Sequence, residues 1–138
     1  MLDSCQCVGH AQGRVTGTRV LPPLERQAVL EISFQGSGEL LGIPITSLGS
    51  SQFVFRDDGV IASDEGHIII TGPTGDIVRL KASGLGRLTG PAPQGRYVTT
   101  GKYETTATSW QYLNEVMGLF EFIVDSTGGF SVKIWEWK

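Results

Sequence analysis

The stretch that decides the fold is residues 77–105, which read IVRLKASGLGRLTGPAPQGRYVTTGKYET. On both sides of its central proline loop, charged or polar residues alternate with apolar or small ones. Arg79 and Lys81, for example, alternate with Val78 and Leu80. Successive side chains of a strand point to opposite faces, so this period of two predicts two antiparallel β-strands, each with one wet face and one buried face.

The same period of two, interrupted by glycine and proline, covers most of the remaining chain. It predicts further strands at residues 12–21, 28–37, 38–46, 52–56, 60–71, 119–125 and 130–137. Several of these strands are long and kinked by glycine, as closing a sheet into a barrel requires. The sequence therefore predicts an all-β fold, a closed antiparallel β-barrel of about eight strands.

The chain has 138 residues, which is close to the common size of a single domain. No charge run or low-complexity tract divides it. We expect one barrel domain over residues 12–138, preceded by a flexible N-terminal tail at residues 1–11.

One segment departs from the period of two. Thr108 begins a capping-box signature, and apolar residues follow at helical spacing: Trp110, Leu113 and Met117. This pattern predicts one short amphipathic helix near residues 109–117. Its apolar stripe must be covered, so we expect the helix to cap an open end of the barrel.

Composition and charge limit the partners. The formal net charge is -3, the sequence pI is about 5.3 and the mean hydropathy is +0.01. No positive field is available to attract phosphate backbones, so nucleic acid is not an expected partner. The chain shows no run of about 18–20 apolar residues and no signal-peptide pattern, so we expect no membrane partner and a cytoplasmic location.

The two cysteines, Cys5 and Cys7, are separated by a single residue. A disulfide at that spacing would be strained. With His10 the two thiols offer three zinc ligands, but a fourth ligand is needed and His67 is the only other histidine. We expect bystander thiols and no metal site.

Inward aromatic residues make up the candidate binding site. Alternation places Tyr97 and Tyr103 on an inner face, with small residues between them. Phenols separated by small residues leave room for a ligand and offer hydroxyl donors, the alternative being core tyrosines bonded to backbone. The other predicted substrate-binding residues are Phe34, Phe53, Phe55 and Phe122, with Trp110 and Met117 closing the pocket.

Two places are candidates for acid–base chemistry. Glu136 shares a face with Ile134, and a carboxylate buried there would tend to keep its proton and act as a proton donor. The alternative is a place at the wet rim, because Glu136 is near the C-terminus. Glu65 and His67 share a strand face and offer an acid–base pair, or else point outward.

Two further motifs, Gly84-Leu85-Gly86-Arg87-Leu88-Thr89-Gly90 and the terminal Lys133-Ile134-Trp135-Glu136-Trp137-Lys138, resemble a family of small bacterial proteins of unknown role. That family is associated with the allene oxide cyclase-like barrel, which is lipocalin-like in form. The resemblance implies a fold-level relation to cyclases of oxidised fatty acids and of polyketides, including enzymes of (4+2) cycloaddition.

The favoured function is a cofactor-free cyclase or isomerase that folds a hydrophobic polyketide- or lipid-like substrate inside the barrel. Tyr103, Glu136 and Tyr97 are the expected catalytic residues. A non-catalytic carrier or sensor of a small apolar ligand is the first alternative. A filled barrel that acts through an oligomer interface is the second. Three apolar side chains lie on predicted outer faces, namely Ile69, Leu119 and Ile123. Their exposure favours a homo-oligomer, most simply a dimer.

Overall fold

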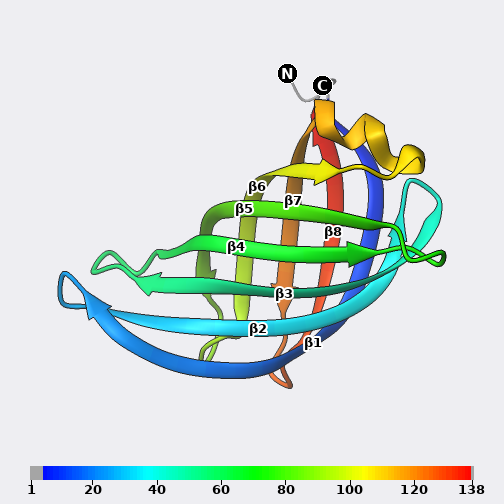
Figure 1. Cartoon of the computed structure of the whole chain (residues 1–138). Coiled ribbons are helices and arrows are strands. Elements are labelled where there is room, and N and C mark those ends of the chain that lie inside the picture. Colours follow the sequence, from blue (N-terminus) through cyan, green and yellow to red (C-terminus); the bar gives the residue numbers. More distant parts are fainter. Residues whose placement is uncertain (1–4, 138) are drawn as a thin grey trace.

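The structure is a computed structural model of the chain, and it describes residues 5–137. It is a closed antiparallel barrel in which eight strands follow one another in chain order and the last pairs with the first (Figure 1). The predicted all-β barrel is therefore confirmed. Its strands are β1 (Cys5–Leu24), β2 (Gln27–Leu40), β3 (Ile43–Phe55), β4 (Ile61–Thr71), β5 (Ile77–Leu88), β6 (Gly95–Thr105), β7 (Met117–Val124) and β8 (Gly129–Trp137).

The first strand begins earlier than predicted. Residues 5–11 were expected in a flexible tail, but they belong to β1, and Cys5 pairs with Trp137 of β8. The tail prediction is wrong for these residues because their strand partner lies at the other end of the chain, where local composition does not reveal it. Residues 1–4 of the predicted tail lie outside the described residues.

The strand predicted at residues 38–46 is instead divided between β2 and β3. Leu41 and Gly42 form the turn between these strands, with φ of 52° and 78°. These left-handed backbone angles end one strand and allow the next to start. Pro44 pairs opposite Glu39 near the start of β3.

The predicted helix is present, but it is a 3₁₀-helix, η2 (Thr108–Glu115). Its N-cap is Ala107 and makes no side-chain hydrogen bond, so the predicted capping box is wrong. A 3₁₀-helix has three residues per turn, which aligns Trp110, Leu113 and Val116, and all three are buried. Met117 was expected on the helix but starts β7 and is 37% exposed.

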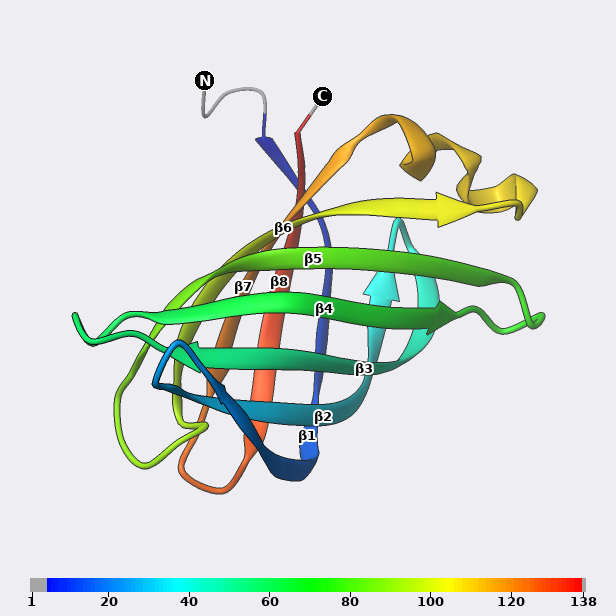
Figure 2. The ribbon, with the colours of Figure 1, turned by 60° about the vertical axis from the view of Figure 1, so that its left-hand side comes forward.

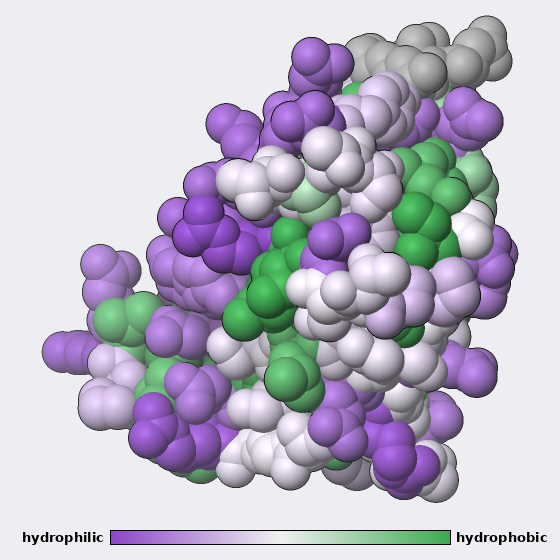
Figure 3. Space-filling model, turned by 45° about the vertical axis from the view of Figure 1, so that its right-hand side comes forward, coloured by the Kyte–Doolittle hydropathy of each residue, from purple (hydrophilic) through white to green (hydrophobic). Residues whose placement is uncertain are grey.

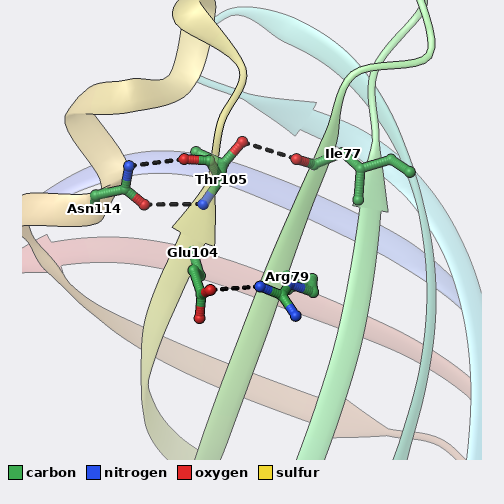
Figure 4. Close-up of polar contacts among 5 residues, drawn as sticks. All are labelled: Ile77, Arg79, Glu104, Thr105 and Asn114. Carbon is green, nitrogen blue, oxygen red and sulfur yellow. Dashed lines mark hydrogen bonds and ion pairs between the residues drawn. The ribbon is translucent and has the colours of Figure 1, made fainter.

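Side-chain hydrogen bonds attach η2 to the end of β6. Asn114 accepts a hydrogen bond from the Thr105 backbone N–H at 2.9 Å and donates one to the Thr105 carbonyl at 2.9 Å (Figure 4). The Thr105 hydroxyl donates to the Ile77 carbonyl at 2.8 Å, which continues the attachment to β5. Arg79 and Glu104 form an exposed ion pair beside it. The position of η2 over the barrel is therefore set by its hydrogen bonds to the end of β6, which is in turn bonded to the start of β5.

The two ends of the barrel differ. The helix end carries η2, the start of β1 and the end of β8 (Figures 1 and 2). The far end carries the loop between β5 and β6, at residues 89–94, and the β7–β8 turn. Trp110, Leu113 and Leu40 are almost completely buried and fill the helix end.

Glycines of the inner wall make room for aromatic rings. A Cβ on Gly86 would lie 2.2 Å from Cδ1 of Tyr97, and a Cβ on Gly118 would lie 2.6 Å from Cζ of Phe120. The Tyr97 ring therefore covers the backbone of the neighbouring β5, and the Phe120 ring covers the backbone of its own strand, which any larger residue would prevent. This packing explains the glycines at these two positions.

Apolar side chains on the outer face do not merge into one surface in the view of Figure 3, where hydrophobic patches are separated by polar residues. Ile69 and Ile123 are 48% and 51% exposed, and Leu119 is half-buried. The dimer stays a prediction. Within residues 5–137, no helix has both the length and the apolar character that crossing a membrane demands.

Candidate functional site

The candidate site is a cavity of about 90 Å³ inside the barrel. Its walls include Pro93 of the β5–β6 loop at the far end, and Ile45 and Ile70 near the opposite ends of β3 and β4, but not Trp110 of η2. Most of its wall is made by apolar residues of the inner strand faces. These are Ala11, Val15, Ile32, Phe34, Ile45, Phe53, Ile68, Ile70, Leu80, Ala82, Phe120, Phe122, Val124, Phe130, Val132 and Ile134.

Aromatic contacts hold the wall together. Phe53 stacks on Tyr97 with ring centroids 4.7 Å apart. Phe34 makes T-shaped contacts with Phe122 and Phe130, with ring centroids 6.1 and 5.6 Å apart. Such offset and edge-on pairs are favourable beyond the area they bury. Phe34 and Phe122 are only partly buried, so the aromatic cluster borders the more accessible part of the cavity.

Four of the predicted site residues line this cavity: Tyr97, Phe34, Phe53 and Phe122. Tyr97 was expected to offer a free phenol to a substrate. Its hydroxyl instead donates to the Pro93 carbonyl at 2.8 Å. The alternative of a core tyrosine bonded to backbone therefore describes Tyr97, and its ring contributes an apolar wall.

The other predicted residues lie elsewhere. Tyr103 and Trp110 are buried but do not line the cavity, and Phe55 is a half-buried residue at the end of β3. Met117 does not close the pocket either, because it is on the outside of β7. Tyr103 was grouped with Tyr97 by the strand face that they share, and the structure separates the two along the barrel axis.

Glu136 lies inside the barrel and not at the rim. Glu136 is 3% exposed, and the Tyr112 hydroxyl of η2 donates a hydrogen bond to its Oε1 at 2.6 Å. Burial, and then the charge of Glu136, raise the pKa of the Tyr103 phenol. Glu136, Tyr112 and Tyr103 lie at the helix end and are not part of the cavity wall. Glu136 and Tyr103 therefore do not face a ligand held in the cavity.

The other polar candidates point outward. Glu65 and His67 contact each other at 3.3 Å on the outside of β4, and both side chains are more than half exposed. Glu65 has a φ of 51° at the β-bulge of this strand. Cys5 and Cys7 are free thiols. Residues 5–137 contain no cluster of three or more His, Cys, Asp or Glu side chains that could hold a metal ion.

Serine and threonine hydroxyl groups supply the polar part of the cavity wall, and none of these residues is among the site residues predicted from the sequence. The Ser51 and Ser63 hydroxyls are 2.9 Å apart and both residues are buried. The Thr99 hydroxyl is buried and has no hydrogen-bond partner among the described residues. Leaving a buried hydroxyl unpaired costs about 1–3 kcal/mol. Alternation along β6 could have identified Thr99, since it lies between the two inward tyrosines.

The cavity carries no charged chemistry. Among the described residues, no Asp, Glu, His, Lys or Arg side chain lines it. It can therefore exclude water, shape an apolar molecule and offer neutral hydrogen bonds, but it brings no carboxylate or imidazole to a substrate. An engineered cavity of about 150 Å³ holds benzene. The cavity of about 90 Å³ is smaller than that, so a ligand that fits without movement of the aromatic rings is itself small.

Alkaline pH should destabilise the barrel through Tyr97. Burial raises the pKa of Tyr97 to about 12, from an ordinary value of 10.0. The unfolded chain releases this proton at a lower pH than the folded protein does. The contribution of the Tyr97 phenol to the free energy of unfolding is therefore complete below pH 10 and is lost as the pH rises toward 12. Urea denaturation across this pH range should show a smaller loss of stability for Tyr97→Phe than for the unmodified protein. Equal losses would contradict this account.

Comparisons with known proteins support the fold. No protein-family model matches the chain, and no curated protein matches it significantly in sequence. A conserved protein of unknown function from Rhodopseudomonas palustris superposes with a TM-score of 0.81 at 13% identity, over 96% of this chain and 95% of its own. A β-barrel-like protein from Acinetobacter baumannii gives 0.80 at 12% identity, over 97% and 96%.

A third solved structure, described as an enzyme from Penicillium herquei, superposes with a TM-score of 0.72 at 13% identity, over 97% of this chain and 93% of its own. Identities this low establish a shared fold only. The barrel implied by the sequence resemblance is thus confirmed, while the resemblance to a family of small bacterial proteins associated with the allene oxide cyclase-like barrel stays a prediction.

Proposed function

We propose that this protein binds a small hydrophobic molecule inside its barrel. The observation that carries the proposal is the cavity of about 90 Å³, which is lined by apolar side chains and a few neutral hydroxyls. An apolar lumen of this kind stabilises a hydrophobic ligand by removing its surface from water. Binding of this kind requires no ionisable group, and none other than Tyr97 lies in the described wall.

Filling the cavity should abolish binding. Ala82 lines the wall and is 8% exposed, so Ala82→Leu puts three more carbon atoms into the lumen. Xenon under pressure is a suitable probe because it is apolar and small enough for this space. In titrations followed by amide NMR shifts, we expect saturable xenon binding to residues of the inner wall, and at least a tenfold weaker affinity in Ala82→Leu.

Ser83→Leu is the matched control, since Ser83 is the next residue of β5 and its side chain is exposed. We expect this variant to bind xenon as the unmodified protein does. No saturable shifts in the unmodified protein, or equal losses in the two variants, would overturn the proposal. The first of these results would favour a filled barrel that acts through its outer surface.

Catalysis is a second candidate function, namely cyclisation or isomerisation of an unsaturated polyketide- or lipid-like substrate, including (4+2) cycloaddition. Holding a flexible chain in a near-attack conformation lowers the entropic barrier and needs no cofactor. The enzyme from Penicillium herquei with the same fold favours this candidate. The lumen would have to widen for such a substrate, and the partly buried Phe34 and Phe122 are placed to move.

Turnover separates binding from catalysis. A linear polyene able to close by intramolecular cycloaddition would be incubated with the protein, and the product would be resolved by chiral chromatography. Enantiomeric excess that disappears in Ala82→Leu would support an enzyme. A racemic product at the uncatalysed rate, together with saturable xenon binding, would leave a carrier or sensor.

A further inference from the structure

The wall formed by β4, β5 and β6 carries two hydroxyls in one row across the strands. Ser63 of β4 pairs with Gly84 of β5, and Gly84 pairs with Thr99 of β6. Ser63 and Thr99 are 5% and 6% exposed, and both line the cavity. The residue between them is glycine, so no side chain separates the two hydroxyls along this row.

The two hydroxyls differ in their hydrogen bonding. Ser63 shares a hydrogen bond of 2.9 Å with Ser51, whose Oγ also lies 3.4 Å from the Asp64 carbonyl. Thr99 has no partner among residues 5–137, although its hydroxyl is buried and lies in the cavity wall. A threonine hydroxyl has one donor and two acceptor positions. The Thr99 O–H group is therefore available to a ligand at a point where apolar side chains surround it.

We propose that Thr99 selects, among small hydrophobic molecules, those that carry one hydrogen-bond acceptor, and that a ketone or aldehyde is the ligand class of this barrel. This inference rests on the proposed binding function. The hydroxyl donates to the carbonyl oxygen, and the apolar wall encloses the hydrocarbon part. A hydrocarbon of the same shape meets the same wall but leaves the hydroxyl unpaired, which a site built to hydrogen-bond its ligand disfavours.

The test compares cyclobutanone with methylenecyclobutane, which have the same shape but differ in the acceptor oxygen. Both probes would be titrated into the unmodified protein and into Thr99→Val, with affinities measured from amide NMR shifts. We expect Thr99→Val to weaken cyclobutanone binding at least fivefold and to leave methylenecyclobutane binding within twofold. Thr99→Ser keeps the hydroxyl and should keep cyclobutanone affinity within twofold.

Thr100→Val is the matched control, because Thr100 is the next residue of β6 and is exposed. It should change neither affinity. Equal loss of both probes in Thr99→Val would overturn the inference, as would no change for either. If xenon binds but cyclobutanone does not, the ligand class is wrong and the proposed binding function stands. If xenon does not bind either, the proposed function itself fails.

Discussion

Replacing Trp110 by alanine is expected to lower the free energy of unfolding by about 3–5 kcal/mol, the usual cost of truncating a buried tryptophan. Trp110 is 1% exposed, and its indole packs so closely on Gly72 that a Cβ there would lie 2.7 Å from Cη2 of the ring. Removing the ring opens a cavity between η2 and the barrel. The backbone turn at Gly72 cannot collapse into it without breaking its hydrogen bond to Asp76.

Trp137→Ala removes the same side chain from the outside of β8, where Trp137 is 41% exposed. We expect this control to cost much less than Trp110→Ala, about 1 kcal/mol or less. Urea denaturation of both variants gives the comparison, provided that both unfold in one transition. Similar losses would show that η2 does not seal the helix end. Trp110→Ala should still bind xenon at urea concentrations below its unfolding midpoint, because Trp110 does not line the cavity.

Gly84→Ala should destabilise the barrel by about 2–3 kcal/mol, which is large for the addition of one methyl group. A Cβ on Gly84 would lie 2.0 Å from the Val98 carbonyl oxygen and 2.6 Å from the Thr99 Cα. Both are backbone atoms of β6, so no side-chain rotation relieves the overlap. The strands must move apart, which lengthens the hydrogen bonds between β5 and β6.

Gly17→Ala is the matched control in another strand. The nearest atom to a Cβ on Gly17 is the Ser33 Cβ at 3.9 Å, which is an ordinary contact. This substitution should be neutral or stabilise the protein by about 0.4–1 kcal/mol, because alanine restricts the unfolded chain. Thermal unfolding of the two variants checks the contrast. A Gly84→Ala variant as stable as Gly17→Ala would mean that the β5–β6 backbones are not as close as described.

Along β6, local sequence was sufficient to predict which residues face inward. Tyr97, Thr99 and Tyr103 alternate with exposed residues along β6, as the period of two predicts. Ile69 is exposed on β4, on the outer face where alternation places it. This prediction succeeds because the direction of a strand side chain depends only on its own backbone, and one polar face suffices to reveal it.

Helix type and chain ends were predicted less well. Met117 fits the spacing of an α-helix, but the buried residues follow the period of three through Trp110, Leu113 and Val116. Residues 5–11 resemble a tail in composition and become a strand only because β8 is available to pair with them. In both places contacts with strands elsewhere in the chain, which the local sequence does not show, fix the conformation.

The sequence by itself determined the barrel and, on a strand with one polar face such as β6, the inner or outer direction of the side chains, because both follow from a repeating local pattern. Only the tertiary structure decided where each inward residue lies along the barrel axis. Tyr97 reaches the cavity, whereas Tyr103, on the same face of β6, is packed at the helix end near Phe120. The physical reason is that closure pairs strands at one register, and register depends on partners far away in the chain.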